Sequence, residues 1–342
     1  MSVTPVKSAL VGLVCWFVTG FVLHPSPFDL KWGVLLFLLA PLVLLPLGLQ
    51  LVEPETRNGV ERWLWRYASS LQLPAAIALL TAFAFPAGLL AGLLCLPWLL
   101  TMAMISLSGL IRAWRRGVWP LAELSIDAGK SYLIVGAIWA LLSRLGVRPL
   151  NFEPVIVLLT AIHFHYAGFL LPVMTGLAGR HLKTRVAGIA AFGVITGVPF
   201  TAIGITISQL GIGHTPEMLA VLITAPSGLL TAGLHFMLAA RQLQLRIVRW
   251  CWLIAAISLS FGMLLAVLYG SRFYLELSWL DIPLMRGSHG SINALGFGLI
   301  GLIGWYLTGM NEYENMQNSP RSTARSEQYR RSRSGDEKLR VQ

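Results

Sequence analysis

The chain has 342 residues, of which 56% are hydrophobic and only 12% are charged. A soluble globular domain carries about 25% charged residues, so this composition excludes an ordinary soluble enzyme, a disordered protein and a nucleic-acid-binding domain. It predicts a polytopic membrane protein in contact with the lipid bilayer, while the net charge of +11 raises the question of an anionic partner.

Ten apolar stretches are long enough to cross a bilayer, since a spanning helix needs about 20 mostly apolar residues. They lie at residues 4–23, 32–52, 71–88, 91–111, 120–143, 154–175, 186–210, 217–240, 247–270 and 288–308. The third and fourth run together into a length that exceeds one bilayer core about twofold, so we expect a turn between them at Pro86 and Gly88. The fold class predicted is an all-α bundle of ten transmembrane helices, with the first stretch retained rather than cleaved.

The distribution of basic residues supports this count. With ten spans, 20 of the 26 lysines and arginines fall on the side of the two termini, five fall on the other side, and Lys130 lies inside a span. Loops on the cytoplasmic side of a membrane are enriched in basic residues, so both termini are predicted to be cytoplasmic. The positive charge is then mainly a topology signal.

The chain divides into two parts of different composition. Residues 1–311 form the predicted membrane domain, and residues 312–342 form a basic tail rich in Ser and Arg with almost no apolar residues. Such a tail cannot bury a core, so we expect it to be disordered in the cytoplasm. The three cysteines have no CxxC spacing, which argues against a disulfide framework or a zinc knuckle.

The fifth stretch carries three ionisable residues on one helical face, Glu123, Asp127 and Lys130. Ionisable side chains inside a membrane are costly, which makes them candidates for function. One reading is an internal Asp127–Lys130 pair that joins helices. The other is a proton or ion relay, or one wall of a polar pocket.

The sixth stretch places two histidines near the bilayer midplane, in the string HFHY. His163 and His165 point to opposite helix faces, so they do not comfortably share one metal ion, and Tyr166 follows directly. They are either neutral histidines bonded between helices, or groups for proton transfer, substrate binding, or metal or haem ligation. The string resembles the helix of haem–copper oxidases that ligates two cofactors, but the HPEVY-like run and the adjacent HH pair of that family are absent. The sequence therefore assigns no cofactor.

The tenth stretch begins with His289 and, one turn deeper on the same face, Asn293. We expect His289 at the outer interface. If the sixth and tenth stretches are neighbours, a cavity could open to the outside with the histidines of the sixth stretch at its floor. His235, in the eighth stretch, is predicted to be a helix-contact residue.

Three strings together identify a family. HFHYAGF at 163–169, HGSINALGFG at 289–298 and DAGKSYLIVGAIW at 127–139 resemble the YndJ-like family of bacterial polytopic membrane proteins. The resemblance implies a location in the bacterial cytoplasmic membrane and a shared site, but no particular reaction.

Four functions fit these residues. The first is a small-solute transporter with a midplane site made by His163, His165 and Asp127, since transporters bind near the midplane. The second is a membrane-embedded enzyme that uses His and carboxylate acid–base chemistry on a lipid-like substrate. A haem- or metal-linked protein and an accessory subunit are the third and fourth. The partners expected are the bilayer and a small-molecule or lipid-like ligand, and no nucleic acid.

Overall fold

The computed structural model describes residues 5–53 and 59–317. Within these residues the chain is all-α, without strands, and ten helical segments are long and apolar enough to cross a membrane. We number them spans 1 to 10 in chain order. The predicted all-α polytopic bundle is therefore confirmed.

Seven of the spans in the described residues are single helices. They are α1 (Pro5–Leu23), α4 (Val60–Ala84), α5 (Leu89–Arg116), α6 (Leu121–Leu145), α9 (Arg185–Gln209), α10 (Thr215–Arg241) and α11 (Arg246–Gly270), which form spans 1, 3, 4, 5, 7, 8 and 9. A short 3₁₀ turn, η2 (Pro149–Asn151), follows α6. The turn predicted at Pro86 and Gly88 is confirmed, because α4 ends at Ala84 and α5 begins at Leu89.

Spans 2, 6 and 10 are interrupted by π-helical segments. Span 2 consists of α2 (Leu30–Leu39), η1 (Ala40–Leu44) and α3 (Leu45–Leu51); span 6 of α7 (Pro154–His163), η3 (Phe164–Leu170) and α8 (Leu171–Leu182); and span 10 of α12 (Ile282–Met285), η4 (Arg286–Gly290), η5 (Ile292–Ile300) and α13 (Gly301–Gln317). Pro41 and Pro46 in span 2, and Pro172 after η3, lack the N–H that an α-helix needs. Single π-turns often occur at functional sites.

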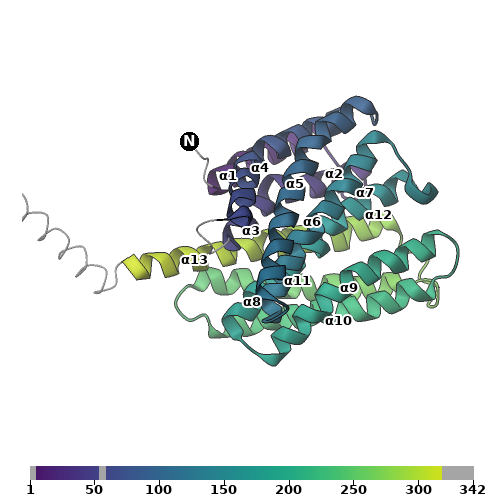
Figure 1. Cartoon of the computed structure of the whole chain (residues 1–342). Coiled ribbons are helices and arrows are strands. Elements are labelled where there is room, and N and C mark those ends of the chain that lie inside the picture. The colour runs from purple at the N-terminus through teal and green to yellow at the C-terminus, as the bar shows by residue number, and fades with distance from the viewer. Residues whose placement is uncertain (1–4, 54–58, 318–342) are drawn as a thin grey trace, which may run out of the picture.

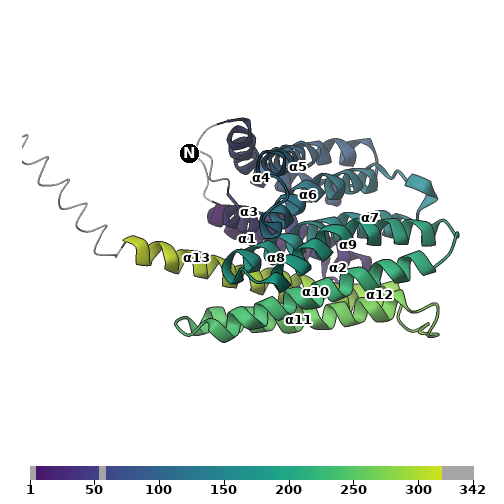
Figure 2. The same cartoon turned by 60° about the horizontal axis from the view of Figure 1, so that its bottom comes forward.

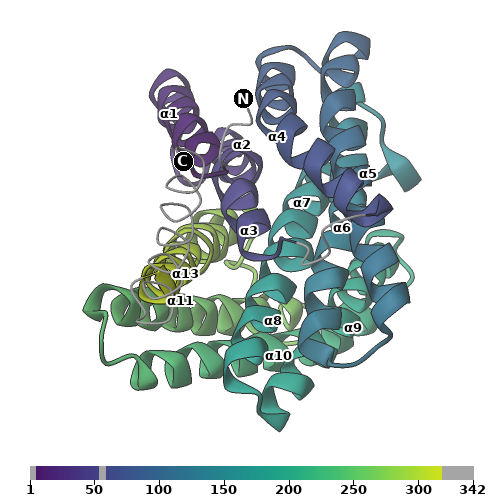
Figure 3. The ribbon, with the colours of Figure 1, turned by 60° about the vertical axis from the view of Figure 1, so that its left-hand side comes forward.

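The three interrupted spans lie together in the middle of the bundle. Spans 3, 4 and 5 pack on one another on one side, and spans 7, 8 and 9 do so on the other (Figures 1–3). Span 2 contacts span 6, span 6 contacts span 10, and span 10 contacts span 2. Span 1 covers the outer side of span 2 and buries only Ser8, Ala9, Gly12 and Trp16.

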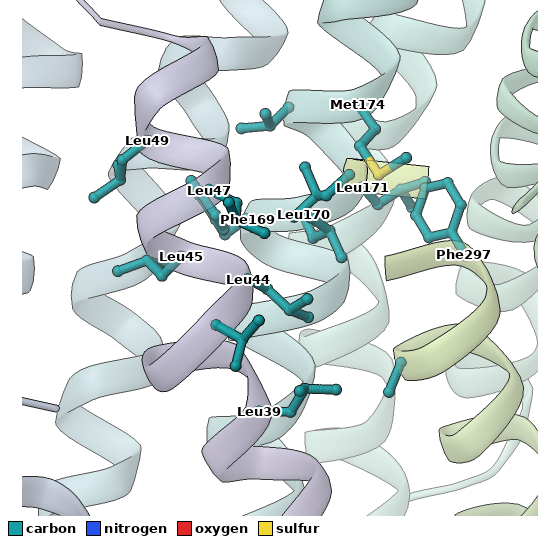
Figure 4. Packing of buried hydrophobic residues seen from close by; sticks show 14 of the residues in the cluster. Leu39, Leu44, Leu45, Leu47, Leu49, Phe169, Leu170, Leu171, Met174 and Phe297 are labelled. Atoms are coloured by element: carbon teal, nitrogen blue, oxygen red, sulfur yellow. The ribbon is translucent and has the colours of Figure 1, made fainter. Parts of the chain in front are cut away.

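A dense hydrophobic layer joins these central spans. Leu39 and Leu44 of span 2 face Phe169 and Leu170 of span 6, Leu45 lies on the other side of span 2, and Phe297 of span 10 closes the group (Figure 4). Each of these residues is at most 3% exposed to solvent. Because lipid tails are as apolar as leucine, van der Waals packing rather than the hydrophobic effect holds such a layer together.

Two spans begin earlier than predicted. Span 3 begins at Val60 instead of 71, so Arg62 and Arg66 lie in its first two turns. Long basic side chains can reach the headgroup region while their backbone stays helical. Hydropathy alone therefore places the beginning of such a helix too late in the chain. Span 10 begins at Ile282 instead of 288, which places His289 about 10 Å from the first residue of the helix.

The C-terminal helix continues beyond the predicted end of the membrane domain. α13 runs to Gln317, whereas we expected the tail to begin at 312. The remainder of the predicted tail, 318–342, lies outside the described residues.

We call the end of the bundle where α1 begins the basic end, because Arg112, Arg116 and Arg180 lie there. With an even number of spans in the described residues, α13 also finishes at this end. His163, His165 and His289 lie in the half near the opposite end.

Candidate functional site

His163 and His165 of span 6 use one ring nitrogen in the same way. Nδ1 of His163 lies 2.7 Å from the carbonyl oxygen of Leu159, and Nδ1 of His165 lies 2.8 Å from that of Ala161. A carbonyl oxygen only accepts a hydrogen bond, so Nδ1 carries the proton in both rings. The remaining nitrogen, Nε2, decides what each histidine can do.

His165 is fully bonded. The indole Nε1–H of Trp98 donates to its Nε2 at 3.3 Å, and Phe37 packs edge-on against the ring. The side chain is 1% exposed, and a Cβ on Gly136 would lie 2.7 Å from Nδ1. The two ring nitrogens are thus satisfied inside protein, and His165 connects spans 4, 5 and 6.

His235 repeats this arrangement near the basic end. Its Nδ1 donates to the carbonyl oxygen of Thr231 at 2.9 Å, and the indole of Trp305 donates to its Nε2 at 3.2 Å. The ring is completely buried. The predicted helix-contact role of His235 is confirmed, and its contact is between spans 8 and 10.

His163 and His289 differ from these two. Nδ1 of His289 donates to the carbonyl oxygen of Gly262 at 2.8 Å, while no described residue forms a hydrogen bond with Nε2 of either His163 or His289. His163 is exposed and His289 is half-buried. α7, which carries His163, and η4, which carries His289, both contact α2, so the two histidines lie on neighbouring parts of the central spans.

Asn293 completes this group with a third unused acceptor. Its Nδ2 donates to the carbonyl oxygen of His289 at 2.9 Å, which fixes the orientation of the amide. Its Oδ1 is buried and has no hydrogen-bond partner among the described residues. A Cβ on Gly262 would overlap this amide, so the glycine allows the close approach of span 9. We call His163, His289 and Asn293 the histidine site.

Tyr166 connects span 6 to span 2 rather than to the histidine site. Its hydroxyl donates to the carbonyl oxygen of Leu36 at 2.6 Å. That oxygen is available because the N–H of Ala40 bonds to Phe37 instead, and Pro41 has no N–H.

The carboxylates of span 5 belong to a separate cluster at the basic end. Arg112 and Arg116 each donate to Asp127 at 2.7 Å, and Asp127 is completely buried. Arg112 also pairs with Glu123, which in turn accepts from Arg180 of span 6. We call these five residues the arginine–carboxylate cluster. It connects spans 4, 5 and 6 and does not include any histidine.

The predicted pair between Asp127 and Lys130 is wrong. The carboxylate is used by the two arginines, and Nζ of Lys130 has no hydrogen-bond partner among the described residues. The ammonium instead lies 4.8 Å from the centre of the Trp65 ring, an attractive position for a cation.

The sequence reasoning thus brought together residues that the fold separates. Asp127 does not join His163 and His165 in one midplane site, and His165 is not free to bind a ligand through Nε2. The predicted site residues also omit Arg112, Arg116 and Arg180, which bind the two carboxylates. A signal existed: two arginines four residues apart precede, across a short turn, two carboxylates four residues apart.

The described residues do not form a closed set of ligands for a metal ion or a haem. The described residues contain no group of three or more His, Cys, Asp or Glu that could hold a metal ion. The haem-type arrangement would need both His163 and His165 as ligands, yet Trp98 occupies Nε2 of His165.

Comparison with known proteins identifies the family. The model of the family described as "YndJ-like protein" matches residues 35–297, which contain the histidine site and the arginine–carboxylate cluster. The chain belongs to the YndJ-like family. The resemblance inferred from the three sequence strings is therefore confirmed.

A curated YndJ relative shows how much of the length is shared. "Uncharacterized membrane protein YndJ" of Bacillus subtilis (strain 168) is 29% identical to this chain over 211 residues. These residues make up 61% of this chain but only 37% of the relative, so the chain covers well under half of that protein. No solved structure matches this YndJ-like chain.

Proposed function

We propose that this member of the YndJ-like family transports a small solute that binds at the histidine site. The observation that carries the proposal is the pair of imidazole Nε2 atoms on His163 and His289, in membrane-spanning helices, without any hydrogen-bond partner in the described residues. Polar groups at such a depth are normally satisfied, because each unmade hydrogen bond costs about 1–3 kcal/mol. An exposed and a half-buried ring therefore suit a ligand that comes and goes.

The chemistry of the site favours a particular class of solute. Nε2 of His163, Nε2 of His289 and Oδ1 of Asn293 are all acceptors, and none has a donor in the described structure. Three acceptors and no donor suit a solute that carries hydroxyl, amine or ammonium hydrogens. The same histidines can also take up a proton, which would couple transport to a proton gradient.

Two layers separate the histidine site from the basic end. The hydrophobic layer of spans 2, 6 and 10 comes first (Figure 4), and the arginine–carboxylate cluster follows. A transporter needs such a barrier on one side while its site is open to the other. The π-helical segments of these spans provide irregular backbone where a change of register can open the barrier.

We further propose that the basic end faces the cytoplasm of a bacterial cell. Cytoplasmic loops carry the excess of lysine and arginine, and the basic end has most of those residues. The histidine site would then open to the outside. A reporter active only in the cytoplasm, fused after Gln342, should be active; an inactive fusion would reverse the orientation.

Uptake by proteoliposomes tests the transport proposal. The probes are radiolabelled ethanolamine, which has both ammonium and hydroxyl donors, rubidium ion, and a proton gradient followed with an internal pH dye. We expect at least one probe to enter, and His163→Gln or His289→Gln to reduce its rate about tenfold, as expected for losing a hydrogen bond to a charged group.

The matched control is His24→Gln, since His24 lies in an exposed turn outside the spans. It should leave uptake unchanged. Flat traces for all probes, or equal loss in all three variants, would contradict transport at this site. His163 is exposed, so thermal unfolding of His163→Gln should match wild type to within about 0.5 kcal/mol and exclude misfolding.

A membrane-embedded enzyme is the second candidate. Its specific support is the exposed His163, because an imidazole with a free Nε2 at the depth of the acyl chains could act as a base on a lipid-like substrate. Incubation with bacterial lipid extract, followed by mass spectrometry, tests it. A product that forms with wild type and not with His163→Gln would favour the enzyme over the transporter.

A further inference from the structure

A second polar region lies at the basic end, on the side of the bundle away from spans 7 to 9. Here α1, α3 and the first half of α4, which are neighbouring helices in Figure 3, line a cleft of about 930 Å³. A volume of this size is typical of sites for organic ligands. The cleft shares no residue with the histidine site or with the arginine–carboxylate cluster.

The mouth of the cleft carries positive charge. Arg62 and Arg66 lie one turn apart on α4; Arg62 pairs with Glu53 at 2.7 Å. Arg66 is exposed and has neither an ion-pair nor a hydrogen-bond partner among the described residues. A free guanidinium binds phosphate with two parallel hydrogen bonds, which makes Arg66 the natural anion contact of the cleft.

The deeper part of the cleft is polar as well. Gln72 lies about 18 Å along α4 from its first residue and is 2% exposed. Its Nε2 donates to the carbonyl oxygen of Pro41 at 2.6 Å, but its Oε1 is buried without a partner in the described structure. An acyl chain alone would leave this acceptor unsatisfied, whereas a hydroxyl group would satisfy it.

Aromatic side chains indicate that the cleft meets the membrane surface. Trp63 and Tyr67 border it and are 54% and 50% exposed, and Trp and Tyr are enriched where headgroups meet acyl chains. On the neighbouring α1, Leu10, Val14 and Phe17 are exposed apolar residues, so lipid surrounds this side of the protein.

We propose that this cleft binds an anionic glycerophospholipid whose headgroup carries hydroxyl groups. Arg66 holds the phosphodiester, a headgroup hydroxyl donates to Oε1 of Gln72, and the acyl chains leave along α1 and the aromatic pair. The site would attach a lipid to the side of the bundle that contains span 2. It is independent of the proposed transport function, since the two share no residue.

Native mass spectrometry of the full chain tests the assignment. The detergent-purified, delipidated protein is titrated with dioleoylphosphatidylglycerol or with dioleoylphosphatidylcholine, whose headgroup is neutral overall and has no hydroxyl. We expect preferential binding of phosphatidylglycerol, and about tenfold weaker binding by Arg66→Gln, in line with the loss of a charged hydrogen bond. Arg66→Lys should lie between the two, because it keeps the charge and loses the paired geometry.

The matched control is Arg249→Gln. Arg249 is also exposed near the beginning of a span at the basic end, but it lies on α11, away from the cleft. Binding by this variant should equal wild type. Equal loss in both variants, or binding by Arg66→Gln within twofold of wild type, would overturn the site. If soluble glycerol 1-phosphate displaced the lipid at a similar concentration, the proposal of a lipid ligand would be overturned. The cleft would then be assigned to a soluble organic phosphate.

Discussion

Four histidines of the membrane-spanning helices fall into two pairs that differ at a single atom. His165 and His235 each receive a tryptophan N–H at Nε2 and are buried, whereas His163 and His289 leave Nε2 unbonded and retain exposure. All four use Nδ1 for a backbone carbonyl. The difference separates histidines that hold helices together from histidines that can receive a ligand, although the residue type is the same.

The arginine–carboxylate cluster belongs with the bonded pair. Asp127 is buried between two arginines, as His165 is buried beneath Trp98. Polar groups that satisfy one another inside a membrane protein stabilise helix contacts. The bonded region should therefore respond to substitution with a loss of stability, and the histidine site with a loss of function.

The largest effect on stability is expected for Asp127→Ala. Removing one partner of a buried ion pair leaves uncompensated charge and typically costs about 3–5 kcal/mol; here the charge is left on Arg116, while Arg112 keeps Glu123. Chemical denaturation in detergent, followed by tryptophan fluorescence, measures it. Glu153→Gln, at an exposed position, is the control and should change little. A cost of less than about 1 kcal/mol for Asp127→Ala would mean that the cluster is not structural.

A smaller loss is expected for His165→Leu. The substitution keeps an apolar side chain of similar length but leaves the Trp98 indole N–H buried without an acceptor, at about 1–3 kcal/mol. Uptake per folded molecule should be retained. The comparison between the two histidine pairs would fail if His165→Leu abolished uptake while its unfolding curve stayed at the wild-type position.

The smallest effect on stability with a clear effect on uptake is expected for Gly262→Ala. The added methyl group overlaps the Asn293 amide and displaces it from His289, which should lower uptake severalfold at a cost of about 1 kcal/mol. Gly233→Ala is the matched control, because a Cβ there meets nothing within 4 Å. Equal uptake by the two alanine variants would show that the position of the Asn293 amide does not matter for transport.

Hydropathy and charge were sufficient to predict the ten spans and the all-α class, while the family followed from the resemblance of three sequence strings. These properties are local: an apolar stretch of bilayer length must be helical, since no water is present to satisfy its backbone. The same reasoning placed the beginnings of spans 3 and 10 too late in the chain: Arg62 and Arg66 lie inside the helix of span 3, and span 10 begins at Ile282.

Which polar residues act together depended on the tertiary structure alone. Spacing along the chain places Glu123, Asp127 and Lys130 on one face, but the arginines that bind the carboxylates come from the preceding helix and from span 6. Likewise, nothing in the string HFHY tells which histidine receives the indole of Trp98, 67 residues away. Hydrogen bonds between helices depend on how the helices pack, and a pattern within one helix does not contain that information.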